Sequence, residues 1–263
     1  MTDFEHLRLE RPAEGIARIV LDNPDQRNAM SPAMTTSWVR AIDQLAHDPD
    51  VRVVVVTGAG SAFSSGGDTA WLAGDGTRTV DELRTQMLGF YRSWLSIRRL
   101  EVPTIAAING HAVGAGLCLA LACDLRFAAD GARMSVPFTR LGLHPGMAGT
   151  FLLPDVVGPA VARDLFLTGR AVTGQEALTL GLVSRVIAPD SFADDVLAAA
   201  SSIAEAAPIA TRLTKTALAR GHADLDACLA WEGLAQPVTL ATADLQEGIA
   251  AVQEKRRPRF TGR

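Results

Sequence analysis

Two glycine-rich junctions hold the residues of this sequence that could do chemistry. The first covers 56–68 (VTGAGSAFSSGGD) and the second covers 108–116 (INGHAVGAG). Each follows an apolar run that is typical of a buried strand. Small residues after a strand let the backbone approach a ligand and direct N–H groups at it. The second junction also opens a helix, whose first N–H groups are unpaired and favour negative charge. Together the junctions could form an oxyanion site, although for either one alone the spacing favours turns and close packing.

A dinucleotide-binding loop is the first alternative, because residues 58–60 (GAG) begin like the fingerprint G-x-G-x-x-G. The third glycine of that fingerprint falls on Phe63, and in the second junction it falls on Leu119. Short-chain dehydrogenases also need a Tyr-x-x-x-Lys pair, but the single tyrosine, Tyr91, is followed four residues later by Leu95. Hydride transfer is therefore disfavoured.

Composition excludes several other classes of protein. The chain has 263 residues with 48% hydrophobic and 21% charged residues, which is typical of a folded globular protein. A net charge of −4 provides no basic field for nucleic acid. Three cysteines without a C-x-x-C pair favour a reducing, cytoplasmic compartment, and the five scattered histidines predict no metal site. We expect no secretory peptide and no membrane span.

The elements that must position the junctions alternate between strand and helix. Such alternation predicts right-handed crossovers and a layered α/β fold. From residue 191 onward, alanine-rich helical segments dominate, so we predict a core over 1–190 and a helical C-terminal region over 191–263. The apolar faces of these last helices would need a partner, either the core or another subunit. The predicted strands are 16–21, 51–57, 103–109 and 124–128, and the predicted helices are 32–47, 80–99, 117–123, 192–206, 209–220, 225–243 and 245–255.

A resemblance to a known family becomes specific at these same junctions. Residues 62–68 (AFSSGGD) resemble the F-x-x-G-x-D loop of the enoyl-CoA hydratase/isomerase (crotonase) superfamily. Residues 109–116, followed by 122–124 (ACD), are similar to its second signature. The matches run in order across nearly the whole chain. The further ones are 22–30 (DNPDQRNAM), 145–150 (PGMAGT), 167–183 and 247–258.

The resemblance implies a spiral of ββα units with a helical C-terminal trimerisation region. It further implies an acyl-CoA thioester as ligand, coenzyme A as part of the substrate without a separate cofactor, and a homo-trimer or a dimer of trimers. The backbone N–H groups of Ser65 and Ala115 would form the oxyanion hole for a thioester enolate. The residues implied in substrate or CoA binding are Arg27, Ala29, Gly66, Gly67, Asp68, Gly114, Cys118, Phe138 and Lys255.

The acid and base groups of the family are missing from this sequence. Its hydratases use two glutamates, and the matching positions are Cys118 and Phe138. A position that holds aspartate in some relatives is Gly146 here. His144 is the candidate proton carrier that we rank first, because histidine titrates near neutrality, but it could equally fill a loop. Asp68 could cap a helix instead of contacting the ligand.

Two functions therefore stay open. The chain could be an enzyme that works through an oxyanion-stabilised enolate, or a non-catalytic binder of acyl-CoA that has lost its proton-transfer groups. A hydrolase of carbon–carbon bonds is a third and more distant alternative.

Overall fold

The computed structural model describes residues 4–74 and 76–263. Its centre is a six-stranded sheet in the order β1-β2-β3-β5-β7-β10, parallel except for the β1–β2 pair. The β-branched run Val53–Val56 is buried on both faces, as in other parallel sheets. The strands are β1 (Leu7–Ala13), β2 (Ile16–Leu21), β3 (Val53–Gly58), β5 (Thr104–Ile108), β7 (Leu125–Ala129) and β10 (Arg185–Ile187).

A second, four-stranded sheet has the order β4-β6-β8-β9. Its strands are short and directly follow strands of the large sheet: β4 (Ala62–Ser64) follows β3, β6 (His111–Val113) follows β5, and β8 (Arg133–Ser135) follows β7. The strand β9 (Ala171–Thr173) closes this sheet in antiparallel orientation. Helices come after each pair of strands, so the chain winds as the spiral of ββα units that the sequence predicts.

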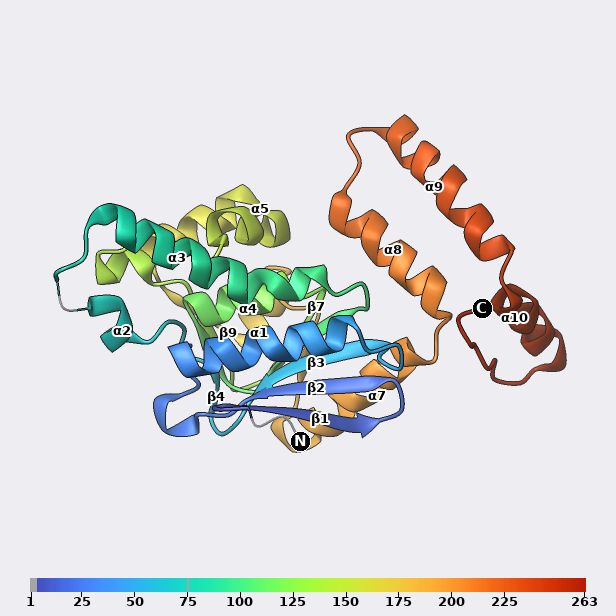
Figure 1. Cartoon of the computed structure of the whole chain (residues 1–263), viewed down its shortest axis with the longest axis horizontal. Coiled ribbons are helices and arrows are strands. Elements are labelled where there is room, and N and C mark those ends of the chain that lie inside the picture. Colours follow the sequence, from blue (N-terminus) through green and yellow to red (C-terminus); the bar gives the residue numbers. More distant parts are fainter. Residues whose placement is uncertain (1–3, 75) are drawn as a thin grey trace.

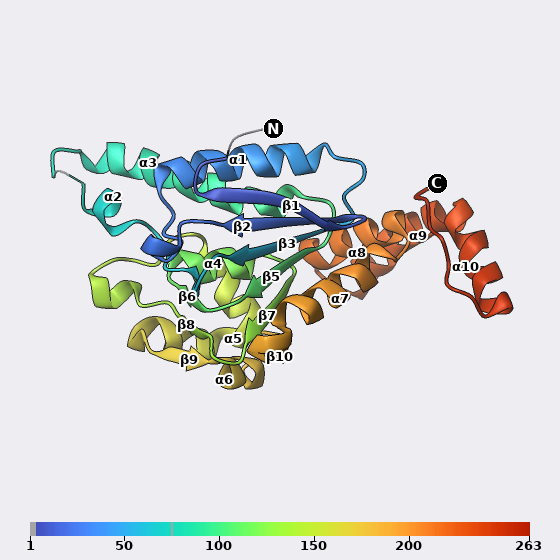
Figure 2. The same cartoon turned by 90° about the horizontal axis from the view of Figure 1, so that it is seen from below.

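The helices of the core start at the residues that cap them. In α1 (Pro32–Ala46) the Ser31 side chain accepts from the Met34 N–H group, and α3 (Val80–Trp94) begins with a capping box of Thr79 and Glu82. These two helices lie side by side over one face of the large sheet (Figures 1 and 2). The others are α2 (Thr69–Ala73), α4 (Ala115–Ala122), α5 (Gly149–Thr168) and α6 (Gly174–Thr179), with short 3-10 turns at Pro24–Gln26, Leu95–Arg99, Phe138–Leu141 and Pro189–Ser191.

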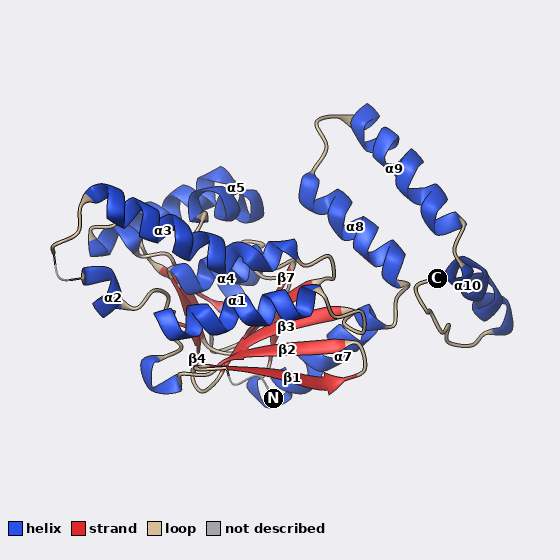
Figure 3. Ribbon diagram, viewed as in Figure 1, coloured by secondary structure: helices blue, strands red, loops and turns tan. Residues whose placement is uncertain are grey.

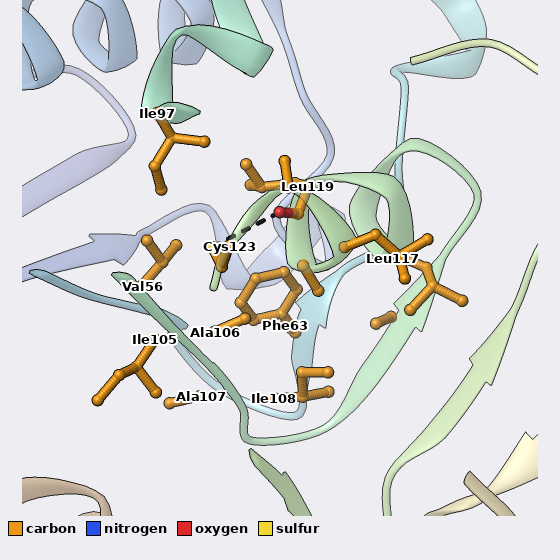
Figure 4. Packing of buried hydrophobic residues seen from close by; sticks show 14 of the residues in the cluster. Val56, Phe63, Ile97, Ile105, Ala106, Ala107, Ile108, Leu117, Leu119 and Cys123 are labelled. Carbon is orange, nitrogen blue, oxygen red and sulfur yellow. Dashed lines mark hydrogen bonds between the residues drawn. The ribbon is translucent and has the colours of Figure 1, made fainter. Parts of the chain in front are cut away.

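The core fills the space between the sheets and α4. Phe63 of β4 is fully buried and lies at the centre of a cluster with residues of β3, β5 and α4 (Figure 4). Every residue of α4 is buried, so this helix is surrounded by protein on all sides. Such close packing fixes the position of its amino end, which belongs to the second glycine junction.

The C-terminal helices divide into one that joins the core and three that project from it. The helix α7 (Phe192–Ala204) buries Phe192, Val196, Ala200 and Ala204 against the core. Next come α8 (Pro208–Arg220), α9 (Leu225–Leu240) and α10 (Ala243–Glu254), which extend away from the sheets (Figures 1 and 3). Neither α8 nor α9 has a buried residue. The predicted helical region is therefore present; its division from the core at residue 191 stays a prediction.

Several expected elements differ from the structure in detail. The stretch 58–67 is not wholly a loop, because β4 lies within it, and α4 begins at Ala115 rather than at residue 117. The helix expected over 80–99 ends at Trp94 and continues as a 3-10 turn. Within the described residues, no helix combines the length and the apolar character that a membrane span requires.

Candidate active site

The two glycine junctions meet because their strands are neighbours. The strands β4 and β6 pair in parallel, with Ser64 opposite Ala112, so their carboxyl ends reach the same edge of the small sheet. Gly66 has a φ of +94°, and a Cβ atom placed on it would lie 2.6 Å from the Val113 carbonyl oxygen and 3.2 Å from the Ala115 nitrogen. Only glycine fits this close approach of two backbones.

The amino end of α4 is buried and has no cap. Gly114 precedes the helix with a φ of +55° and offers no side chain, and the first helical bond is donated by the Cys118 N–H group to the Gly114 carbonyl oxygen at 3.0 Å. Within the described residues no acceptor faces the N–H groups of Ala115 and Gly116, although both residues are buried. A buried helix end without partners is a site where a ligand oxygen can accept.

Ser65, the other predicted donor, is already bonded. Its N–H group donates to the Arg27 carbonyl oxygen at 2.9 Å, and its hydroxyl donates to the Gln26 carbonyl oxygen at 3.3 Å. Arg27 is exposed and has a φ of +51°, a left-handed conformation that turns its carbonyl group toward the junction. The expectation of two open donors is therefore wrong at Ser65 in this structure. The role of Ser65 in an oxyanion hole stays a prediction.

Asn28 holds this turn in place, and sequence reasoning did not single it out. It is fully buried; its Oδ1 accepts from the Asn23 N–H group at 2.9 Å, and its Nδ2 donates to the carbonyl oxygens of Ala59 and Ala62 at 2.9 and 2.8 Å. These bonds hold Arg27 and Ala29 at the edge of the first junction. The sequence predicts that both residues contact CoA. A buried asparagine that satisfies three backbone groups can be recognised only after folding.

Cys118 and Phe138 lie close to the amino end of α4. The Cys118 thiol is buried with its sulfur 3.8 Å from the Gly146 carbonyl oxygen. Burial raises the pKa of this thiol to about 12, so it stays protonated at neutral pH. A Cβ atom placed on Gly114 would lie 3.7 Å from the Phe138 ring. Both residues thus lie beside the second glycine junction, and their roles in substrate binding stay predictions.

The turn before α5 lies against Cys118. Met147 and Ala148 have φ values of +54° and +53°, which are strained conformations for residues other than glycine. A Cβ atom placed on Gly149 would lie 3.0 Å from the Cys118 sulfur, so the backbone of the turn is in close contact with the thiol. His144 is exposed, and its Nδ1 lies 2.8 Å from the Pro145 carbonyl oxygen. Its predicted role as proton carrier stays a prediction.

Comparison with known proteins places this architecture in a family. Residues 11–263 match the family model described as enoyl-CoA hydratase/isomerase. The chain belongs to the enoyl-CoA hydratase/isomerase family. It is 38% identical to the bovine (Bos taurus) mitochondrial "Enoyl-CoA hydratase domain-containing protein 2", over 97% of this chain and 87% of the relative.

Solved structures of family members have the same fold. An enoyl-CoA hydratase from Bacillus anthracis has a TM-score of 0.92 and 33% identity, covering 98% of this chain and 100% of its own. A protein titled enoyl-CoA hydratase/carnithine racemase, from Magnetospirillum magneticum, has a TM-score of 0.87 and 31% identity, covering 99% of this chain and 97% of its own. The crotonase fold is therefore shown for this family member.

Tyr91 lies beside the turn at Gly146, and the sequence reasoning considered it only for a dehydrogenase. It is half-buried on α3, and a Cβ atom placed on Gly146 would lie 2.5 Å from its hydroxyl oxygen. Burial raises its pKa, and the nearby Cys118 thiol raises it further. The period of α3 could have placed Tyr91 on the inner face beside Phe90, but no local pattern indicates which turn it meets.

The remaining residues predicted to bind the ligand are Asp68, Gly67 and Lys255. Asp68 is the N-cap of α2, and its carboxylate accepts from the N–H groups of Ala70 and Trp71. Asp68 therefore caps α2, which is the alternative that the sequence left open, and any contact of Asp68 with a ligand stays a prediction. Gly67 pairs with Met30 as an isolated bridge beside the junction. Lys255 is exposed and follows α10, on the projecting part of the chain.

A cavity elsewhere in the molecule does not coincide with this site. It has a volume of about 720 Å³ and lies between α8 and the edge of the core, where Asp124 and Lys215 line it. The Lys215 ammonium is 2.8 Å from the Asp124 carboxylate and donates to the Val102 carbonyl oxygen. These contacts attach α8 to the core. This cavity is therefore separate from the glycine junctions.

Proposed function

We propose that this protein binds an acyl-CoA thioester with its carbonyl oxygen at the amino end of α4, where backbone N–H groups stabilise an enolate-like oxygen. The observation that carries the proposal is the buried, unpaired N–H group of Ala115 opposite Gly66. A backbone donor aimed at a developing negative charge is worth about a hundredfold to a thousandfold in rate.

The second donor of this oxyanion hole requires a change of partner at Ser65. Its N–H group would leave the Arg27 carbonyl oxygen and donate to the thioester oxygen. A bond between neutral backbone groups contributes only about 1 kcal/mol net, whereas a bond to a charged acceptor contributes about 1.5–3 kcal/mol. Exchange is therefore favourable once negative charge develops, and the exposed position of Arg27 leaves its turn room to adjust.

The second candidate function is a binder of acyl-CoA without turnover. Hydration needs one group that takes a proton from water and another that delivers a proton to carbon. Cys118 and Phe138 stand where the family's hydratases have glutamates, and a thiol with a pKa of about 12 is no base at neutral pH. These residues, together with the occupied Ser65 donor, favour the binder over a conventional hydratase.

The coenzyme A end of the ligand would be held by cations from two places. Arg27 is exposed beside the first junction, whereas Lys255 belongs to the projecting helices. Large apolar side chains on those helices are exposed, including Leu218, Leu234 and Val252. We propose that they are covered in a homo-trimer or a dimer of trimers, in which Lys255 would reach the ligand of a neighbouring copy.

The deciding experiment is calorimetric titration of the full chain with a saturated acyl-CoA, followed by an assay of water addition to a short 2-enoyl-CoA. Binding with turnover supports the enzyme, and binding without turnover supports the binder. Absence of binding to any CoA ester contradicts the proposal as a whole. Free coenzyme A is the control, because it has no thioester carbonyl group.

A substitution at the junction connects this result to the site. In Gly66→Ala the new methyl group would meet the Val113 carbonyl oxygen and crowd the Ala115 N–H group, so we expect acyl-CoA binding to weaken by at least tenfold. The matched control is Gly131→Ala, where nothing lies within 4 Å of the added Cβ atom. Equal affinity of the two folded variants would place the thioester elsewhere.

A further inference from the structure

Tyr91 reaches the candidate site from an element that neither glycine junction includes. It stands on α3, with its ring centroid 6.2 Å from that of the buried Phe90. A Cβ atom placed on Gly146 would lie 2.5 Å from the Tyr91 hydroxyl oxygen and 2.9 Å from the ring carbon that bears it. The hydroxyl therefore occupies the space that any side chain at position 146 would need.

This position is close to the amino end of α4. Cys118 is in contact with Gly146, its sulfur being 3.8 Å from the carbonyl oxygen of that residue. Because an α-helix rises by about 1.5 Å per residue, Cys118 lies about 4.5 Å along the axis from Ala115. Tyr91 and the first turn of α4 thus contact the same residue, Gly146.

The other titratable groups around Tyr91 are poorly suited to transfer a proton there. The Cys118 thiol faces it from α4 and is fully buried. His144 adjoins the turn that holds Gly146, but it is exposed and its ring nitrogen faces the Pro145 carbonyl oxygen. Within the described residues, the contacts around Tyr91 include no carboxylate, and no hydrogen-bond partner holds its hydroxyl.

We propose that Tyr91 is the catalytic residue that exchanges a proton with the carbon next to the thioester carbonyl group; this inference rests on the proposed function. In one direction the tyrosine O–H bond breaks, the enolate electron pair forms a C–H bond at that carbon, and the C–O bond regains its double bond. The tyrosinate then takes a proton from water and releases hydroxide. In the other direction Tyr91, which is protonated at rest because burial raises its pKa, first gives its proton to hydroxide; the tyrosinate then removes the proton from that carbon, so hydrogens there exchange with solvent.

Solvent exchange tests the proposal without assuming any overall reaction. A saturated acyl-CoA is incubated with the full chain in deuterium oxide, and mass spectrometry follows deuterium at the carbon next to the thioester. We expect exchange by the wild type, a loss of at least about a hundredfold in Tyr91→Phe, and unchanged binding by calorimetry. Arg92→Gln, an exposed neighbour on α3, is the control that should keep the wild-type rate.

Each other outcome is distinct. Wild-type exchange that survives in Tyr91→Phe overturns the proposal, and so does exchange that only His144→Ala abolishes. Binding of acyl-CoA without any wild-type exchange also overturns it, while the binding proposal stands. Failure to bind acyl-CoA at all contradicts the proposed function instead.

The single tyrosine of the chain gives a second, spectroscopic measurement. The ultraviolet absorbance of tyrosinate reports the ionisation of Tyr91 alone, with Tyr91→Phe as the blank. We expect a midpoint above that of free tyrosine, because burial raises its pKa, and a further shift to higher pH when a saturated acyl-CoA covers the hydroxyl. A midpoint that does not move when the ligand binds would overturn the proposal.

Discussion

The two glycine junctions have similar sequences but are held in different ways. Around Gly66 the backbone is fastened by several bonds: Ser65 donates to the Arg27 carbonyl oxygen, Gly66 donates to the Ser64 hydroxyl at 3.1 Å, and the Met30 N–H group donates to the Gly66 carbonyl oxygen at 2.8 Å. Around Ala115 the N–H groups at the start of α4 have no acceptor among the described residues. One junction is tied by hydrogen bonds, and the other is held by the packing of a buried helix.

This difference teaches how a fold can keep donors free. Bonds to side chains and loops fix a backbone but use up its N–H groups. Burial of α4 on all sides fixes the backbone through apolar contacts and leaves the first N–H groups available. A site that must bind a negatively charged oxygen therefore benefits from a helix that is positioned by its packing and not by a cap.

The largest expected effect comes from loosening the tied junction. Asn28→Ala removes the partners of three backbone groups, including the Ala62 carbonyl oxygen, and should lower the free energy of unfolding by about 3 kcal/mol. Denaturant titration at one protein concentration measures this. The control is Asn23→Ala, whose side chain bonds only the exposed Gln26 and should cost below about 0.5 kcal/mol. Equal losses in both variants would show that Asn28 does not fasten the turn.

A smaller effect should follow from crowding the packed junction. In Gly116→Ala the new Cβ atom would lie 2.8 Å from the Ser64 Cβ atom and closer still to the Ser64 carbonyl oxygen, so we expect a loss of about 2 kcal/mol in the free energy of unfolding. Gly89→Ala, in the middle of α3 with nothing within 4 Å, should instead stabilise the chain by about 0.5–1 kcal/mol. If both substitutions stabilise, α4 does not depend on contact with β4.

The sequence was sufficient for features that depend on local patterns. The strand expected over 51–57 and the helix expected from residue 32 correspond to β3 and the start of α1. The two glycine junctions lie together because β4 and β6 pair in parallel and end at the same edge of the small sheet. Secondary-structure propensity and hydrophobic periodicity are sufficient for these elements because the tertiary contacts agree with them.

Features that depend on distant contacts could not be read in the same way. The strand β4 has three residues and pairs only with β6, so the stretch around it looks like a loop. Arg27 adopts a left-handed conformation that its side chain does not favour, next to the buried and hydrogen-bonded Asn28. The contact of Tyr91 with Gly146 joins residues from separate units of the spiral. These tertiary contacts decide which groups lie together at the candidate site.

The smallest expected effect compares the two junctions directly and involves no substitution. Without ligand, the Ser65 amide hydrogen should exchange with solvent more slowly than the Ala115 amide hydrogen, because the Ser65 N–H group is bonded to the Arg27 carbonyl oxygen and the Ala115 N–H group has no partner among the described residues. When a saturated acyl-CoA is added, we expect exchange at Ala115 to slow by about tenfold, which corresponds to about 1.4 kcal/mol for a new hydrogen bond. Hydrogen exchange with mass spectrometry of short peptides measures both. Slower exchange at Ser65 alone, with the ligand bound, would mean that the tied junction and not α4 holds the thioester oxygen.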